Sequence, residues 1–492
     1  FIVSLTFLFI AALSFNRKIF DDLLFNRLII LISFILVLIM TIKYKPNEDY
    51  GFYHLPYIIN LISEKIIFGL SNLQSQYAWN STWLNFSSNF YLPIIGLKGT
   101  QLTNSILYFF TIGLFLNHIF LQKKNHLTLF FSVSILCYII IKFSRISEHG
   151  FDFPANIFLL ISFFYFIQIF NEKNFISKKN LIFFLIFSIL SITIKLNTVP
   201  LLILLLIVFF YLLIKKYDFY QIIIPIIITA LFFTFWIAQQ FIYTSCLLPI
   251  LEFTCFKSSI WFNSELSIGI KSLTGAINKS YWNYTGDLSS IEYSKNFKWV
   301  PTWFSRNVVE LSEHIFSIIF PILILISLNL KYFTKNYSNL KSRNDFINFS
   351  ISIFILSGLF LWFFKSPVIR FGVPFIFLAM FFLINLILNF YFNKIEFKRG
   401  LILLVSIAFI FNISKNLIRI VDYKETQNYW PEILDVKFSS RKVGDFNINY
   451  PDSEIISTKH NLCWSIPFIC DISKGENLRV ERFGEYLIIF KK

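Results

Sequence analysis

Two acidic residues and a histidine follow an apolar segment near the start of the chain. Glu48 and Asp49 are adjacent, and His54 comes five positions after Asp49, with Tyr53 beside it. A carboxylate in apolar surroundings can act as a general base on a hydroxyl group, because desolvation raises its pKa. Solvated charge at a helix end is the structural alternative. Glu48 and Asp49 are therefore candidate catalytic residues, and Tyr53 and His54 are candidate substrate-binding residues.

A second stretch repeats this combination further along the chain. Glu148 and His149 precede Asp152, and Pro154 suits the first turn of the helix that follows. Capping of that helix is the structural alternative for Asp152. Acids near a bilayer are costly unless they serve or pair with something, so the two stretches are expected to face one cavity. Asp152 is a third candidate catalytic residue, and Glu148 and His149 are candidates for substrate binding.

Two basic residues occupy comparable positions. Lys195 interrupts apolar sequence, and Arg370 begins an apolar run three positions after Pro367, in the short turn that starts at Lys365. A fixed guanidinium at such a place suits a phosphate or pyrophosphate group. The alternatives are snorkelling of Lys195 and pairing of Arg370 with one of the acids. Lys195 and Arg370 are thus candidates for binding a donor phosphate.

The region 243–309 is rich in aromatic residues. Tryptophan and tyrosine commonly mark a membrane interface, and the same rings can stack on sugars, so both interpretations stand. The residues concerned are Trp261, Tyr281, Trp282, Tyr284, Trp299 and Trp303.

The elements that carry these residues are expected to be membrane-spanning helices. Hydrophobic residues make up 56% of the 492 residues and charged residues only 15%, which is too little polar surface for a soluble domain. In lipid, apolar runs of about 20 residues must be helical. The net charge of +16 comes from basic loops between these runs, which orient helices, so it does not indicate nucleic acid binding. No P-loop, GxSxG or HExxH motif points to ATP-driven work or serine or metal hydrolysis.

The basic loops alternate in a way that defines the topology. They place the segments 45–100, 144–153, 243–309 and the tail from 415 outside the cell. In the first of these, the apolar residues of 55–66 follow helical spacing, with Asn60, Ser63 and Glu64 on the other face. This pattern predicts an amphipathic helix lying on the membrane. The spans are predicted at 1–14, 27–44, 101–121, 127–143, 154–170, 181–194, 199–214, 221–242, 310–330, 347–364, 368–391 and 400–414.

The predicted fold class is an all-α polytopic membrane protein of about 11 to 13 transmembrane helices. Residues 1–414 form this domain, including the outer loops 45–100 and 243–309. Residues 415–492 are expected to form a small external α+β domain, in which Tyr486–Phe490 reads as a strand. The chain opens with Phe inside an apolar run, so we expect its natural start to precede it.

Four of the five cysteines fall in two close pairs, both in segments predicted to lie outside. Cys246 pairs in sequence with Cys255, and Cys463 with Cys470. Two such pairs predict two disulfides in an oxidising compartment, and no histidine nearby has zinc spacing. Cys137 lies in an apolar run and is interpreted as a packing residue.

In their order along the chain, these motifs resemble the GT-C superfamily of membrane glycosyltransferases. The likeness is strongest to bacterial members related to the protein mannosyltransferase and aminoarabinose transferase branch. It rests on short motifs that run through most of the chain: Glu48-Asp49-Tyr50, Tyr53-His54-Leu55-Pro56, Ser88-Asn89-Phe90-Tyr91-Leu92-Pro93, Glu148-His149-Gly150-Phe151-Asp152-Phe153-Pro154-Ala155, Ile194-Lys195-Leu196, Cys246 with Pro249 and Cys255-Phe256, Ser366-Pro367 with Arg370-Phe371, and Cys463-Trp464 with Pro467 and Cys470.

The resemblance implies a GT-C-like bundle that uses a polyprenyl-phosphate sugar donor at the outer face of the inner membrane. It implies inverting transfer to a hydroxyl of a glycan, lipid or protein acceptor, in cell-surface polysaccharide assembly. Asp49 would be the base, Asp152 the second acid, and Lys195 and Arg370 would bind the donor phosphate. Relatives often have Asp at the position of Glu48, so Glu48 stays an alternative base. Many relatives need no metal, although two acids at one cavity could hold a divalent ion.

Three other functional classes remain as alternatives, one of them a catalytically inactive scaffold that binds a partner. A transporter or flippase of lipid-linked sugars would show internal repeats and charges near the midplane, whereas the charges here fall at helix ends. A polysaccharide polymerase or ligase would rely on a large loop with arginine and histidine. The loop 243–309 contains Arg306 but no histidine. The sequence therefore favours a glycosyltransferase.

Overall fold

The computed structural model describes most of the chain in eleven stretches. They are residues 27–42, 48–121, 126–143, 150–171, 176–269, 275–328, 345–388, 398–421, 433–452, 462–474 and 477–491. The predicted span 1–14 and the candidates Glu148 and His149 lie outside these stretches.

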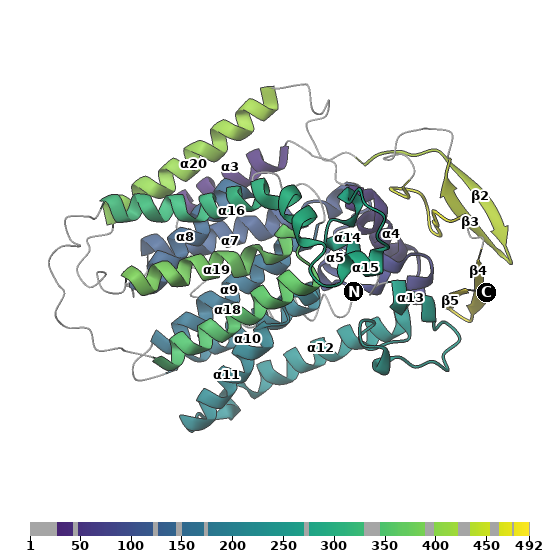
Figure 1. The fold of residues 1–492 in the computed structure, drawn as a ribbon, viewed down its shortest axis with the longest axis horizontal. Coiled ribbons are helices and arrows are strands. Elements are labelled where there is room, and N and C mark those ends of the chain that lie inside the picture. Colours follow the sequence, from purple (N-terminus) through teal and green to yellow (C-terminus); the bar gives the residue numbers. More distant parts are fainter. Residues whose placement is uncertain are drawn as a thin grey trace.

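Long apolar helices form the main body of the molecule (Figure 1). They are α3 (Arg27–Ile42), α7 (Thr103–Leu121), α8 (His126–Lys142), α9 (Asp152–Asn171), α10 (Lys178–Ile194), α11 (Leu201–Ile214), α12 (Ile223–Thr244), α16 (Val300–Leu328), α18 (Asp345–Lys365), α19 (Ile369–Leu388) and α20 (Lys398–Val421). Six segments of the described chain are long and apolar enough to cross a membrane: Leu97–Phe120, Asp152–Phe170, Phe219–Thr244, Val300–Ile324, Phe346–Lys365 and Leu403–Val421. The chain is accordingly an all-α, multi-pass membrane protein with a small sheet region at its C-terminal end.

Each predicted span from residue 27 onward coincides with one of these helices. The largest differences are in α16, which begins at Val300 rather than 310, and in α20, which ends at Val421 rather than 414. The extra turns contain polar residues such as Arg306 and Lys415, which a search for apolar runs leaves out. Hydrogen bonding along the backbone continues a helix past the point where its hydrophobic run ends.

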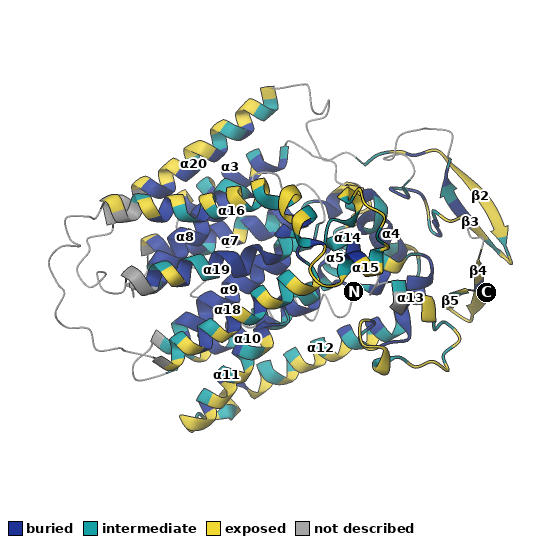
Figure 2. Cartoon of the chain, viewed as in Figure 1, coloured by how far each residue is buried: buried dark blue, intermediate teal, exposed yellow. Residues whose placement is uncertain are grey.

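Burial separates a central helix from helices at the rim (Figure 2). In the most apolar part of α9, 78% of the residues are buried inside the molecule, whereas in that of α12 only 11% are buried. Phe235 and Ile224 of α12 are 55% and 66% exposed. Apolar surface on this scale is unusual on a water-soluble monomer and suits contact with lipid tails.

The described residues that follow α3, from 48 to the start of α7, form only short elements. They are η1 (Tyr50–His54), α4 (Leu55–Ser63), β1 (Ile67–Phe68), η2 (Leu70–Asn72), η3 (Ser75–Ala78), α5 (Thr82–Ser88) and α6 (Leu97–Thr100). The predicted amphipathic helix is present as α4, but it is shorter than expected and ends at Ser63. Asn60, predicted on its polar face, is buried at 4% exposure. That prediction was wrong because protein covers both faces of α4, including α5 packed against it.

The segment between α12 and α16 also consists of short helical turns. They are η6 (Glu252–Thr254), α13 (Ser264–Gly269), α14 (Gly275–Asn278), η8 (Tyr281–Asn283) and α15 (Ser290–Ser294). Trp299 and Trp303 are buried, at 2% and 4% exposure, whereas Trp282 is 72% exposed. The Trp303 indole donates to the carbonyl of Pro367 over 2.5 Å. The two buried tryptophans are therefore packing residues that support the turn before α19, and they have no free face for a sugar.

The tail forms strands. β2 (Phe438–Val443) pairs antiparallel with β3 (Phe446–Pro451), and β4 (Leu478–Phe483) pairs antiparallel with β5 (Tyr486–Lys491). β5 also pairs in parallel with β1, which gives the sheet order β1-β5-β4. The predicted strand at Tyr486–Phe490 is confirmed. The predicted α+β composition is not, since the described residues after α20 contain strands and no helix.

Both predicted disulfides are present. Cys246 is bonded to Cys255, Cys463 is bonded to Cys470, and Cys137 is a buried free cysteine. Mass spectrometry of peptides from unreduced protein is expected to recover both linked pairs, with a free thiol at Cys137 alone. Detection of free thiols at either pair in protein from its native membrane would contradict this expectation.

Candidate functional site

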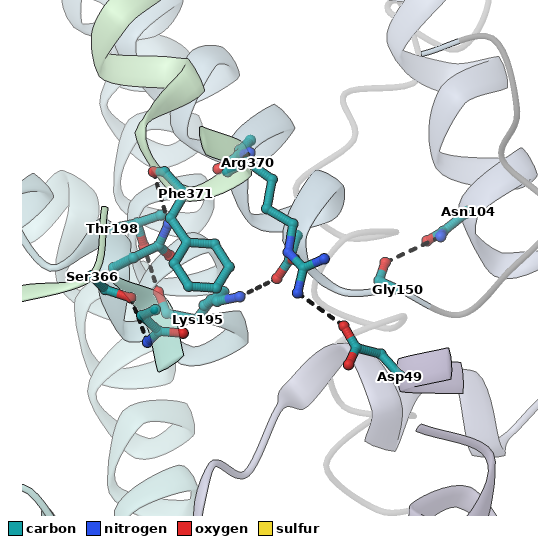
Figure 3. A network of polar contacts seen from close by, with 12 residues as sticks. Asp49, Asn104, Gly150, Lys195, Thr198, Ser366, Arg370 and Phe371 are labelled. Atoms are coloured by element: carbon teal, nitrogen blue, oxygen red, sulfur yellow. Dashed lines mark hydrogen bonds and ion pairs between the residues drawn. The ribbon is translucent and has the colours of Figure 1, made fainter. Parts of the chain in front are cut away.

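Four charged residues meet where α9 and α19 begin and α10 ends, and Figure 3 labels three of them, Asp49, Lys195 and Arg370. Asp49 immediately precedes η1, and Asp152 is the first residue of α9. Lys195 follows the last residue of α10, and Arg370 is the second residue of α19. We call these four residues the charge cluster. One acid from each of the two stretches, Asp49 and Asp152, thus lies in this group of contacts together with both basic candidates.

The Arg370 guanidinium joins the two acids. Its Nη2 donates to Asp49 Oδ2 over 2.9 Å, and its Nε lies 2.7 Å from Asp152 Oδ2. The second contact is an ion pair without a directed hydrogen bond, because the Nε–H of Arg370 makes none. The Lys195 ammonium donates to the other oxygen of Asp152, Oδ1. Two carboxylates therefore balance two cations in one chain of contacts.

The cluster has an exposed half and a covered half. The side chains of Asp49 and Arg370 are 29% and 40% exposed, while those of Asp152 and Lys195 are both 17% exposed. An ion pair in the covered half is weakly screened by water, and removing one partner there leaves an uncompensated charge. A ligand that approaches from solvent meets Arg370 and Asp49 first.

Backbone contacts fix the start of α19 and therefore Arg370. Asn156 of α9 donates to the carbonyl of Arg370 over 2.8 Å, and Asn197 donates to the carbonyl of Phe371 over 3.1 Å. The preceding turn is held by Trp362, whose indole donates to the carbonyl of Val368 over 2.7 Å. These bonds fix the backbone at the start of α19, and the contacts with Asp49 and Asp152 hold the guanidinium itself, so a ligand would bind it at a lower entropy cost.

Aromatic rings surround Lys195. Its ammonium lies 3.5 Å from the centroid of the Phe371 ring and 5.0 Å from that of Phe151. Burial lowers the pKa of Lys195 to about 8, while the Asp152 carboxylate acts in the opposite direction. Sequence reasoning missed Phe151 and Phe371, although each is adjacent in sequence to a residue of the cluster.

His54 lies behind the cluster. It is 5% exposed, its ring centroid lies 4.3 Å from that of Tyr53 and 5.0 Å from that of Phe151, and its Nδ1 has no hydrogen-bond partner among the described residues. Burial lowers the pKa of His54 to about 3; Asp152 opposes this effect. The contact of His54 with substrate stays a prediction. The half-buried Tyr53 lies nearer to solvent.

The low pKa of His54 makes stability depend on pH. Between pH 6.5 and about 3 the unfolded chain binds a proton at this residue and the folded chain does not. The free energy of unfolding is therefore highest above pH 6.5 and decreases as the pH falls through this range. His54→Phe keeps the packing and removes this proton. Relative to wild type, we expect it to reduce the loss of stability on acidification by about 1.4 kcal/mol per pH unit in this range. Thermal unfolding in detergent at several pH values measures the effect, and parallel curves for both proteins would contradict it.

Glu48 lies outside the charge cluster, whereas both basic candidates are paired within it. Glu48 is exposed and takes part in none of the ion pairs of the cluster. Arg370 is paired with Asp49 and Asp152, which is the structural alternative that the sequence offered for this residue. Lys195 does not snorkel away from the protein, since its ammonium contacts Asp152.

The described residues contain no group of three His, Cys, Asp or Glu side chains that could hold a metal ion. The two acids are engaged by cations, which is a poor donor set for a divalent ion.

A cavity of about 460 Å³ reaches the residue next to Lys195. Ile194, Phe86 and Phe235 line its apolar side, and Phe235 is exposed on the rim helix α12. On its polar side, the Asn85 amide donates to Gln239 Oε1 over 2.6 Å. No residue of the charge cluster lines this cavity, and Ile194 is its lining residue nearest in sequence to Lys195.

The charge cluster lies in the part of the chain that matches a known protein family. The sequence model of one family matches residues 1–377, which include all four residues of the charge cluster and end within α19. No curated protein and no solved structure matches the chain. Because the matched stretch is well over half of the 492 residues, the chain belongs to this family, which is described as a domain of unknown function, DUF8201.

Proposed function

We propose that the chain is an inverting glycosyltransferase. It moves a sugar from a polyprenyl-phosphate donor to an acceptor hydroxyl at the outer face of the cytoplasmic membrane, in the assembly of a cell-surface glycan. One observation carries the proposal: Arg370 holds both Asp49 and Asp152, yet 40% of its side chain remains exposed. A preformed guanidinium with a carboxylate beside it offers a phosphate site and a base in one place.

Binding of the donor would release the base. The donor phosphate is an anion that competes with Asp49 for the exposed edge of Arg370, since guanidinium groups bind phosphate well. Asp49 then exchanges its ion pair for the hydroxyl of the acceptor. Asp152 stays with Lys195 in the covered half and keeps the guanidinium oriented.

The transfer itself is a single displacement. Asp49 accepts the proton of the acceptor hydroxyl, whose oxygen forms a bond to the anomeric carbon of the sugar. The bond from that carbon to the phosphate oxygen breaks, and its electron pair leaves with the polyprenyl phosphate. Arg370 and Lys195 stabilise the negative charge on the departing phosphate. Attack opposite to the leaving group inverts the anomeric centre, and the phosphate leaving group requires no strong general acid.

The surroundings of the cluster agree with a lipid-linked donor. The cavity reaches Ile194, next to Lys195, and its apolar side includes the exposed Phe235. In this proposal the polyprenyl chain lies in lipid against the apolar surface to which Phe235 belongs, and the phosphate binds at the charge cluster. Glu48 lies outside the ion pairs, which favours Asp49 as the base.

A transfer assay in membranes tests the proposal. Membranes containing the chain are supplied with a panel of radiolabelled polyprenyl-phosphate sugars, and label is followed into lipid, glycan and protein fractions. Transfer that depends on the chain, with inversion at the anomeric carbon, is the expected result. Movement of intact donor across sealed vesicles without transfer would instead identify a transporter, and extension of a lipid-linked glycan by whole repeats would identify a polymerase.

A further inference from the structure

The tail contacts the segment that carries Asp49 through one tryptophan. The Trp464 backbone N–H donates to the carbonyl of Gly51 over 2.9 Å. The Trp464 ring fills the space beside Gly51 so closely that a Cβ added there would lie 2.1 Å from Cε2 of the indole. The ring also packs edge-on against Tyr50, with 5.7 Å between centroids. The two residues that follow Asp49 are therefore both held by Trp464.

Tyr50 is fixed from its other side as well. It is fully buried, and its hydroxyl accepts a hydrogen bond from the Gln101 side chain. It belongs to a small hydrophobic core separate from that of the bundle, shared by the first outer segment and the tail. The buried members of this core are Tyr50, Leu55, Ile59, Val436, Cys463, Trp464, Ile466 and Cys470.

The loop that presents Trp464 is closed by a disulfide and anchored on a strand. Cys463 precedes Trp464 and is bonded to Cys470. Asn449 of β3 donates through its backbone N–H to the carbonyl of Ile469 over 2.7 Å, and through its side chain to the carbonyl of Pro467 over 3.0 Å. Trp464 adopts a left-handed backbone conformation, with φ of 42°, which an unconstrained bulky residue disfavours. The closed loop is what holds the indole in this position.

We infer that Trp464, fixed by the Cys463–Cys470 loop, is a positioning residue for Asp49. It determines where the carboxylate lies relative to Arg370 by holding the two residues that follow Asp49. The loop lies beyond residue 377, so the positioning part of the site comes from outside the region that matches the family. The inference rests on the proposed role of Asp49 as base, but its geometric content does not depend on transfer.

Thiol labelling can measure this geometry without any substrate. In an Asp49→Cys variant, the new thiol lies beside Arg370 and Lys195 and should react faster with an anionic than with a cationic methanethiosulfonate of similar size. The native cysteines do not compete, since four are in disulfides and Cys137 is buried. Glu48→Cys is the matched control, because it is adjacent in sequence but outside the ion pairs.

Three changes to the loop are then made in the Asp49→Cys chain. Trp464→Leu removes the indole, Gly51→Ala pushes it away while leaving the tail intact, and Cys463→Ser with Cys470→Ser opens the loop. Each is expected to reduce the anionic-to-cationic rate ratio by about five- to tenfold, toward the value of Glu48→Cys. Removing the other disulfide, with Cys246→Ser and Cys255→Ser, is expected to leave the ratio unchanged.

The outcomes are distinct from those of the transfer assay. An unchanged ratio in folded Trp464→Leu and Gly51→Ala chains would overturn the positioning role, whatever the transfer assay shows. An Asp49→Cys chain without charge selectivity would overturn it too, because the thiol would then not face Arg370. A reduced ratio in a chain that transfers no sugar would leave the positioning of residue 49 intact and remove only its proposed role as base.

Discussion

Asp49→Asn is expected to lower the rate of sugar transfer by about 10²- to 10⁴-fold, the usual contribution of a general base. Asparagine has nearly the same shape as aspartate and can still accept the hydrogen bond from Arg370, so the fold should survive. It cannot take the proton of the acceptor hydroxyl at neutral pH. The loss should therefore appear in kcat, measured with saturating donor and at equal amounts of folded protein.

The same substitution should strengthen donor binding. In the wild-type chain Asp49 Oδ2 occupies Arg370 Nη2 at 2.9 Å, so a donor phosphate must displace a carboxylate. A neutral amide competes less well for the guanidinium. A fall in kcat together with a fall in the donor KM would separate loss of the base from loss of the binding site. A rise in KM at unchanged kcat would mean that Asp49 binds substrate and does not act as the base.

Glu48→Gln is the matched control for this experiment. Glu48 is the neighbouring carboxylate, it is exposed, and it lies outside the ion pairs of the cluster. We expect it to retain transfer within about threefold of wild type, as is usual for an exposed residue away from the reacting groups. If Glu48→Gln loses transfer and Asp49→Asn keeps it, the two carboxylates have the opposite roles.

The sequence was sufficient to predict which residues lie at which helix ends. The alternation of basic loops predicted that Asp49, Asp152, Lys195 and Arg370 would share one side, and hydrophobic length located their helices. It could not predict which carboxylate would pair with which cation. Arg370 and Asp49 are 321 positions apart, and their contact depends on the lateral order of helices, which hydropathy does not encode.

The contacts of the tail were beyond sequence reasoning for a similar reason. The close pair Cys463 and Cys470 predicted a disulfide but not that the indole of the adjacent Trp464 would lie against Gly51. Likewise, the strand-like run Tyr486–Phe490 predicted a strand but not its parallel partner β1, which lies between α3 and α7. Partner choice in a sheet depends on the packing of the whole chain, whereas strand formation depends mainly on the local pattern.

Lys195 is the residue for which structural and functional roles can be separated most sharply. Lys195→Met is expected to destabilise the chain by about 3 kcal/mol, because Asp152 is largely covered and would keep only part of its compensating charge. Adding Asp152→Asn removes the uncompensated carboxylate and should restore most of that stability. Thermal unfolding of the two single variants and the double variant in detergent measures the coupling.

Binding of a radiolabelled polyprenyl phosphate to the same proteins then decides the role of the ammonium. A charge-assisted hydrogen bond contributes about 1.5 to 3 kcal/mol, so a phosphate ligand that contacts Lys195 should bind about ten- to a hundredfold more weakly to the stable double variant. Asp152→Asn alone should bind the ligand at least as well as wild type, since it frees both cations from a competing carboxylate. If the double variant binds the lipid as well as wild type, Lys195 only neutralises Asp152, and the phosphate is held by Arg370 without it.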